Sequence, residues 1–205
     1  MSLIGKVLEE VFGIMKWKPL DYVRHSSESE IARDFKGTTH RFYTSEDIAL
    51  LVKMLSGIYA KGETLRSLFQ RGYVEGGIKE AISEFHKYFF GEAEKKKGLT
   101  NGVRFMFPLP EKGSACKRIN LFLRWMVRKD ELDFGLWDFI KPSELIIPVD
   151  THIARIAREL KLTKLKNVSW KMAEEITENL RKYDKNDPIK YDFALCHIGI
   201  RKKEF

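Results

Sequence analysis

The stretch Gly113-Ser-Ala-Cys-Lys117-Arg-Ile-Asn-Leu-Phe-Leu-Arg-Trp125-Met-Val127 decides how the chain folds. Seven of the ten residues from Arg118 to Val127 are apolar, which predicts a helix that is buried on nearly all sides and runs through the centre of a domain. Ser114 has the hydroxyl side chain expected of an N-cap for this helix. We therefore expect Lys117 to lie in its first turn, as residue N3.

Outside this stretch, apolar residues recur at three- and four-residue spacing, and sustained alternation is hard to find. The predicted fold class is therefore all-α, with about ten helices. Thr44 or Ser45 can cap one of them, and Pro19 can open another. We expect helices over residues 3–15, 19–23, 45–58, 64–70, 78–90, 118–127, 151–160, 169–183 and 188–200.

The longest run of turn signals lies between Gly91 and Gly113, with glycines at 98 and 102 and prolines at 108 and 110. It divides the sequence into three parts within one two-lobed helical unit spanning 1–205. Residues 1–91 form a mainly helical N-terminal region, 92–113 a linker or hairpin, and 114–205 the region that carries the candidate chemistry.

The composition is that of a folded protein, with 43% hydrophobic and 32% charged residues. No apolar run reaches the length needed to cross a bilayer, and the N-terminus lacks the pattern of a signal peptide. We therefore expect a cytoplasmic protein with no membrane contact. We also expect it to be a monomer. The two cysteines, Cys116 and Cys196, are too few for a zinc or iron–sulfur site, so no metal, iron–sulfur cluster or other cofactor is predicted.

The formal net charge of +8 and a pI near 9.3 make a polyanion a plausible partner. Basic residues concentrate in two stretches, each of which can also be a solvated helix face. The first contains Lys95, Lys96, Lys97, Arg104, Lys112, Lys117 and Arg118, and the second Arg155, Arg158, Lys161, Lys164, Lys166 and Lys171.

Lys117 is the candidate nucleophile. A cation in the first turn faces the positive end of the helix dipole, which favours the neutral amine that attack on carbon requires. The alternative is a surface lysine whose stem lies along the helix while its head reaches water.

Asp150 is the candidate carboxylate. It precedes Thr151-His-Ile-Ala-Arg155 and is suited to capping that helix through its backbone N–H groups. A capping aspartate stays ionised, and an ionised carboxylate also stabilises positive charge on a reacting sugar. The structural and catalytic interpretations are compatible.

The segments around these two residues resemble the helix-hairpin-helix DNA glycosylases, a superfamily that includes endonuclease III and the archaeal 8-oxoguanine DNA glycosylases. The resemblance covers roughly residues 105–200 and is sharpest at Pro148-Val-Asp150-Thr-His-Ile-Ala-Arg-Ile156. Leu109-Pro-Glu-Lys-Gly113 occupies the place of the family's hairpin, with one glycine instead of two. The 33-residue gap from Lys117 to Asp150 is similar to that of the archaeal branch.

The resemblance implies a two-lobed helical fold that excises a damaged base, with 8-oxoguanine a candidate, from duplex DNA. Lys117 is then the Schiff-base lysine and Asp150 the catalytic carboxylate. Trp125, Trp137 and Asp192 are candidates for the pocket that holds the extruded base, although core packing of the tryptophans and a solvated Asp192 are alternatives. The candidates for DNA phosphate contacts are Lys112, Gly113, Ser114, Arg118, His152 and Arg155.

Two other functional hypotheses remain open from the sequence. The chain can be a nucleic-acid-binding protein that retains the fold without the chemistry, as the single-glycine hairpin suggests. It can also be a helical scaffold for protein partners, which leaves the paired Lys117 and Asp150 segments unexplained.

Overall fold

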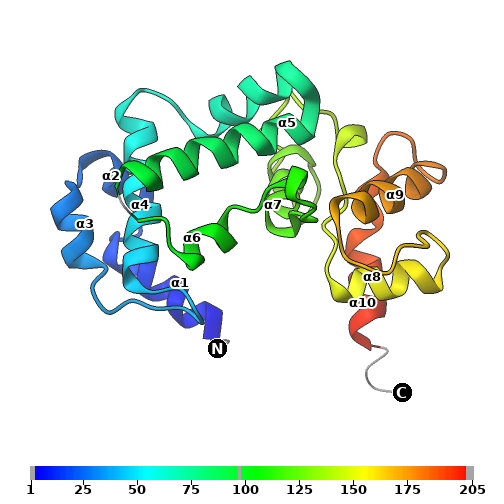
Figure 1. Cartoon of the computed structure of the whole chain (residues 1–205), viewed down its shortest axis with the longest axis horizontal. Helices are drawn as coiled ribbons and strands as arrows, with labels where there is room; N and C mark the ends of the chain where they lie inside the picture. Colours follow the sequence, from blue (N-terminus) through cyan, green and yellow to red (C-terminus); the bar gives the residue numbers. More distant parts are fainter. Residues whose placement is uncertain (1–2, 97, 202–205) are drawn as a thin grey trace. The chain divides into compact units, whose positions relative to one another are not determined.

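Helices make up the regular structure of this chain, and the computed structural model describes residues 3–96 and 98–201 (Figure 1). These residues contain no β-strand, only two isolated bridges, so the all-α prediction is confirmed. The ten described α-helices are α1 (Leu3–Ile14), α2 (Pro19–His25), α3 (Glu28–Asp34), α4 (Ser45–Ala60), α5 (Leu65–Lys95), α6 (Asn101–Met106), α7 (Lys117–Val127), α8 (Thr151–Glu159), α9 (Trp170–Arg181) and α10 (Asp192–Arg201). Three short 3-10 turns are η1 (Pro110–Lys112), η2 (Pro142–Glu144) and η3 (Pro188–Tyr191).

Several helices begin where a side chain can satisfy the free amides of the first turn. Thr44 caps α4 by accepting from the Asp47 amide at 3.3 Å, and Asp47 accepts from the Thr44 amide at 3.0 Å. Thr64 and Ser67 form the same reciprocal pair at the start of α5. Pro19 opens α2, as predicted.

Helix α5 joins two predicted helices across a sharp bend at Gly76 and Gly77. Gly77 has φ +73°, a conformation that favours glycine, and Gly76 is also non-helical. The two arms fold back closely: a Cβ on Gly72 would lie 2.7 Å from the Glu80 carbonyl oxygen and 2.9 Å from Ala81 Cα. Only a residue without a side chain permits this approach.

The chain divides into two compact units that interleave in sequence. The first comprises Met1–Leu68 and Phe85–Phe107, and the second Phe69–Glu84 and Pro108–Phe205. The expected linker, 92–113, therefore contains the end of α5 and the whole of α6, both within the first unit.

The core of the first unit is built from α1 to α4, with α4 packed against α2 and α3. Its buried residues are Met15, Val23, Ile31, Phe35, Ala49 and Val52. A second set of rings closes the unit around Phe107, whose ring stacks on Phe89 at 4.3 Å between centroids and whose carbonyl lies 2.7 Å from His86 Nδ1.

The second unit is organised around α7 and the pair α8 and α10, which pack against each other. One face of α7 is buried through Ile119, Leu123 and Val127, at the three- to four-residue spacing of a helix face. Trp125 on the opposite face is 41% exposed, so the prediction that this helix is buried on nearly all sides is wrong. The apolar residues of that other face line a pocket, described below.

Candidate functional site

The first residue of α7 and the N-cap of α8 meet in the second unit. The Lys117 Nζ atom donates to Asp150 Oδ2 at 2.7 Å, and the two residues form an ion pair. The other oxygen, Oδ1, accepts from the amides of His152 and Ile153, each at 2.9 Å. Asp150 therefore caps its helix with one oxygen and faces the amine with the other.

The backbone before Lys117 differs from the expected cap. The N-cap residue is Cys116, in the left-handed region at φ +47°, rather than Ser114. Its hydroxyl instead accepts from the Cys116 amide at 3.2 Å, a local turn that competes with capping. Lys117 consequently occupies position N1 rather than N3.

The left-handed Cys116 costs roughly 1–2 kcal/mol, which the surrounding packing must supply. Cys116 is buried, the Asn120 side chain donates to the Ala115 carbonyl at 3.0 Å, and the Trp170 amide donates to Gly113 at 3.2 Å. These contacts fix the direction in which Lys117 leaves the helix start.

A cavity of about 510 Å³ opens beside the Lys117–Asp150 pair. The Lys117 side chain is 45% exposed and that of Asp150 23% exposed, so an external molecule can reach both. Aromatic and aliphatic side chains dominate the rest of the wall. The lining residues are Lys117, Leu121, Arg124, Trp125, Leu132, Phe134, Pro148, Asp150, Ile153, Asp192, Phe193 and Cys196.

The two carboxyl groups of this cavity have opposite electrostatic environments. Burial opposes ionisation of Asp150, but the Lys117 ammonium and the amides of Ile153 and His152 outweigh it and lower its pKa. Burial dominates at Asp192 and raises its pKa despite the Arg124 guanidinium. The pKa values of these two neighbouring carboxyl groups are thus shifted in opposite directions, a division typical of acid–base sites.

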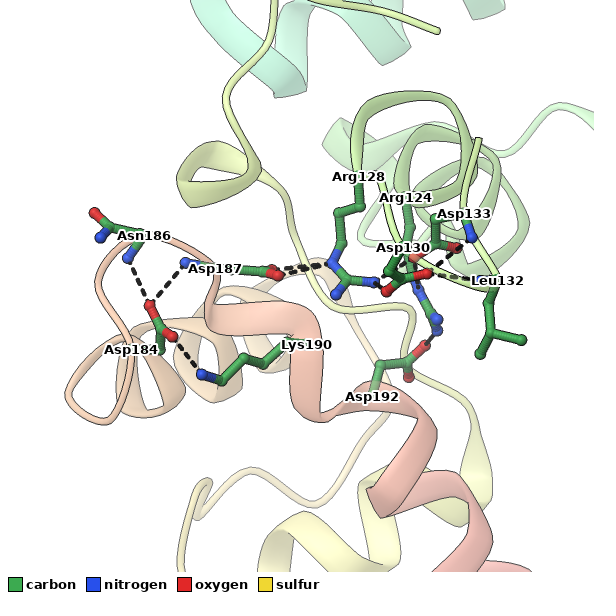
Figure 2. A network of polar contacts seen from close by, with 10 residues as sticks. All are labelled: Arg124, Arg128, Asp130, Leu132, Asp133, Asp184, Asn186, Asp187, Lys190 and Asp192. Atoms are coloured by element: carbon green, nitrogen blue, oxygen red, sulfur yellow. Dashed lines mark hydrogen bonds and ion pairs between the residues drawn. The ribbon is translucent and has the colours of Figure 1, made fainter. Parts of the chain in front are cut away.

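A buried ion-pair network holds Asp192 at the cavity (Figure 2). Arg124 donates to Asp192 Oδ2 at 2.5 Å and to Asp133 Oδ2 at 3.1 Å. Arg128, the C-cap residue of α7, pairs with Asp133 and, at 2.9 Å, with Asp187. The network ties α7 to the segment that leads into α10, so it fixes where α10 presents Asp192.

Neither Cys196, which lines the cavity, nor Cys116 has the lowered pKa expected of a cysteine nucleophile. Burial raises the pKa of the Cys196 thiol, and the carboxylates of Asp150 and Asp192 raise it further. Burial also raises the pKa of Cys116 to about 12. Thiolate chemistry at neutral pH is therefore unfavourable at both positions.

The structure separates the predicted base-pocket residues. Trp125 and Asp192 line the cavity, whereas Trp137 does not and is 5% exposed. The Trp137 ring packs against Phe69, Phe122 and Phe139, with centroids 5.3–5.6 Å apart. The assignment of Trp137 to the pocket is wrong because its ring is buried in this aromatic cluster.

The predicted phosphate-contact residues lie at the two helix starts that carry the pair. Lys112 and Gly113 are exposed in the turn before α7, with Ser114 half-buried and Arg118 exposed after it. His152 and Arg155 are half-buried in α8. From the first basic stretch, Lys97 lies outside the described residues.

The sequence interpretation missed Arg124 and Phe193, both of which line the cavity. Lys117, Leu121 and Arg124 are spaced by four and three residues, which places them on one face of α7. A buried arginine in an apolar run also requires an acidic partner. Those two signals were available in the sequence, whereas the partner, Asp192, could not be identified from spacing.

Beyond the cavity, three acidic residues flank the bend of α5 and could share a cation. The carboxylate oxygens of Glu75, Glu80 and Glu84 lie within 4.8 Å of one another. All three are exposed or half-buried, and such groups are common without an ion.

The chain belongs to the family described as "Protein of unknown function (DUF2400)", which it matches over residues 1–201. No curated protein matches the chain. No solved structure matches it either. No helix in the described part of the chain has an apolar run long enough to cross a membrane.

Proposed function

We propose that this member of the DUF2400 family is a DNA glycosylase with AP lyase activity, acting through a Schiff base on Lys117. The observation that carries the proposal is the 2.7 Å contact between the Lys117 amine and the Asp150 carboxylate, at an open cavity of about 510 Å³. The sequence resemblance to the helix-hairpin-helix glycosylases assigns these same two residues to the reaction.

The cavity suits a single extruded base. Its volume falls within the range of small-molecule sites, and Trp125, Phe134 and Phe193 offer apolar faces on which a base can stack. Asp192 lines the same cavity, and its carboxyl group can form a hydrogen bond with the base edge. This hydrogen bond would select which damaged base is bound, and 8-oxoguanine is a candidate.

The reaction begins with transfer of a proton from the Lys117 ammonium, for which Asp150 is the adjacent acceptor. The free amine attacks the sugar C1′, and the N–C1′ bond forms as the glycosidic bond breaks. The departing base keeps the bonding electron pair and takes up a proton. The base takes this proton from Asp150, which is thereby ionised again and stabilises the positive charge on the sugar as the bond breaks.

Opening of the sugar ring converts the amine adduct into an imine between Lys117 and C1′. Loss of a proton from C2′ then expels the 3′-phosphate and cleaves the strand. Hydrolysis of the imine returns the free lysine. Lys117 and Asp150 act as a unit, so losing either one should nearly abolish turnover.

Phosphate contacts would hold the duplex at the two helix starts. Lys112, Arg118 and Arg155 supply cations there, and Gly113, Ser114 and His152 lie beside them in the chain. In this proposal the partner is damaged duplex DNA, bound by a monomer in the prokaryotic cytoplasm at the nucleoid.

Borohydride trapping tests the proposal directly. The protein is incubated with duplexes containing 8-oxoguanine, uracil or an abasic site, and borohydride reduces any imine to a stable adduct. We expect an adduct with at least one duplex that Lys117→Gln abolishes and that the exposed-lysine control Lys185→Gln retains. Absence of an adduct on every lesion would remove the amine mechanism.

The binding-only alternative gives a different pattern. It yields no adduct and no strand cleavage, with salt-dependent duplex binding that Asp150→Asn leaves unchanged. A chain that binds no duplex at moderate salt would point to the scaffold role.

A further inference from the structure

We infer that the first unit carries a separate site for single-stranded nucleic acid, formed by an aromatic cluster and an adjoining lysine-lined hollow. It goes beyond the proposed function and does not rest on it, because none of its residues belongs to the Lys117–Asp150 cavity. Phe42 and Phe105 are the proposed stacking surfaces, and Lys36 and Lys53 the proposed phosphate contacts.

The aromatic cluster is exposed, although its rings contact one another. Phe42 and Phe105 are each 53% exposed, with ring centroids 4.7 Å apart and planes nearly perpendicular. Tyr43 completes the cluster, 4.5 Å from Phe42. Large rings that stay exposed while packed together present flat faces to solvent, and such faces are what unpaired bases stack on.

A tight turn presents Phe42. His40 and Tyr43 exchange both backbone hydrogen bonds, at 2.9 and 3.1 Å, which leaves Arg41 and Phe42 alone at the tip. Arg41 is exposed at φ +55°, a conformation that non-glycine residues adopt at a cost. The turn thus carries a cation beside an aromatic ring, and exposed Arg104 precedes Phe105 in the same way.

The hollow has a volume of about 680 Å³ and is lined by four lysines and two glutamates. Lys96 pairs with Glu28, and Lys95 pairs with Glu92 at 2.9 Å. Among the described residues, no carboxylate lies at ion-pair distance from Lys36 or Lys53. These two ammonium groups are therefore available to an anion from outside.

The cluster and the hollow are joined through the beginnings of α4 and α6. Ser45 lines the hollow two residues after Tyr43, and Thr100 lines it five residues before Phe105. Thr100 donates to Asp47, and Gly102 lies so close that a Cβ there would clash with the Asp47 carboxylate. This contact holds the start of α6 on α4 in a fixed position.

Exposed rings beside ammonium groups that have no carboxylate partner in the described part of the chain suit a nucleic acid strand. A strand offers phosphates to the lysines and bases to the exposed rings. An apolar protein partner would cover the rings and leave the lysines without compensation, so we commit to nucleic acid.

Fluorescence anisotropy with a labelled oligothymidylate of about 20 nucleotides tests the site, because this probe has little structure of its own. We expect Phe42→Ala/Phe105→Ala to weaken binding about tenfold or more. Tyr183→Ala, which removes a 74% exposed ring from the second unit, should leave binding unchanged. Both rings of the test pair are exposed, so circular dichroism should show an intact fold.

The lysines are tested through the salt dependence of binding to the same probe. Lys36→Gln/Lys53→Gln should reduce the slope of log K against log salt by about 1.4, or about 0.7 per lost phosphate contact. Lys6→Gln/Lys185→Gln removes the same charge elsewhere and should leave the slope close to that of the unmodified protein.

The inference is overturned if the unmodified protein does not bind the probe, as expected of a protein-docking surface. It is also overturned if the double phenylalanine variant binds as tightly as the unmodified protein, or if the control variants lose as much binding or salt dependence as the test variants. The borohydride experiment concerns residues of the second unit, so its failure would leave this result standing.

Discussion

Arg124 in α7 donates to Asp192 at the start of α10 at 2.5 Å, and both side chains are buried where they border the cavity. The pair joins two elements 68 residues apart in sequence. The same guanidinium also donates to Asp133. Removing the Arg124 side chain would therefore take one hydrogen-bond partner from each of two buried carboxylates, Asp133 and Asp192.

Arg124→Met should therefore lower the free energy of unfolding by about 3–5 kcal/mol, the cost of breaking a buried ion pair. Urea denaturation followed by circular dichroism measures the change. The control is Arg33→Met, which removes an exposed ion pair with Asp34 and should cost at most about 1 kcal/mol. Adding Asp192→Asn to Arg124→Met should recover part of the loss. Equal losses for Arg124→Met and Arg33→Met would contradict a structural role for the network.

Asp150 should make stability depend on pH in the acid range. Its pKa is lowered on folding, so its contribution is fully present above the unfolded value of about 3.9 and is lost as pH falls through the folded value. Asparagine caps a helix nearly as well as aspartate, so Asp150→Asn mainly removes the half-exposed ion pair. We expect a loss of up to about 1 kcal/mol at neutral pH that disappears at the acid end of the range.

Thermal unfolding of both proteins at neutral pH and below the folded pKa of Asp150 gives the comparison. A difference that stays constant over this range would show that the charge of Asp150 is not what stabilises the fold. Asp192 acts in the opposite sense: because its pKa is raised, its contribution is fully present below the unfolded value of about 3.9 and is lost as pH rises through the folded value.

Gly72→Ala should destabilise the protein by about 1–3 kcal/mol, because the new Cβ would meet the backbone of Glu80 and Ala81 in the opposite arm of α5. Gly91→Ala is the matched control. It lies in the same helix, its added Cβ meets nothing within 4 Å, and it should be neutral or stabilise by up to about 1 kcal/mol. If both variants have the same midpoint in urea, the arms of α5 do not pack as described.

Both thiols should react slowly with a disulfide reagent at neutral pH. Burial raises the pKa of Cys116 to about 12 and also raises that of the more accessible Cys196, so little thiolate is present at either site. The absorbance of the thiolate that the reagent releases measures the reaction. It should rise slowly with the native chain and rapidly when both cysteines are exposed in denaturant. Rapid labelling of Cys116 in the native protein would mean that the start of α7 opens readily.

The sequence predicted those helices that combine a cap with a long apolar period. Residues 45–58 and 151–160 fall within or beside α4 and α8, each preceded by the residue that caps it. Helix α3 was missed because its seven residues contribute one buried side chain, Ile31, which is too little for periodicity. The reciprocal cap between Ser27 and Glu30 was the available signal.

The approach of Lys117 to Asp150 could not be derived from spacing. Nothing in the 32 residues between them fixes where the two helix starts meet, and the resemblance to glycosylases supplied the expectation. Helix α6 was hidden within a stretch rich in glycine and proline, where Gly102 serves close packing on Asp47 rather than a turn. Trp137 and the Ser114 cap failed for a related reason, since tertiary packing and a local turn outweighed what the residue type favoured.

The interleaving of the two units constrains how the polypeptide can mature. Residues 69–84 belong to the second unit, while the segments on both sides of them belong to the first. A nascent chain leaving the ribosome cannot complete the first unit before residue 107 has emerged. At that point residues 69–84, which include the bend of α5, have been synthesised, but residues 108–205 of the second unit, on which they pack, have not. Neither unit can be excised as one continuous fragment, so partial digestion or truncation should yield no autonomously folding half.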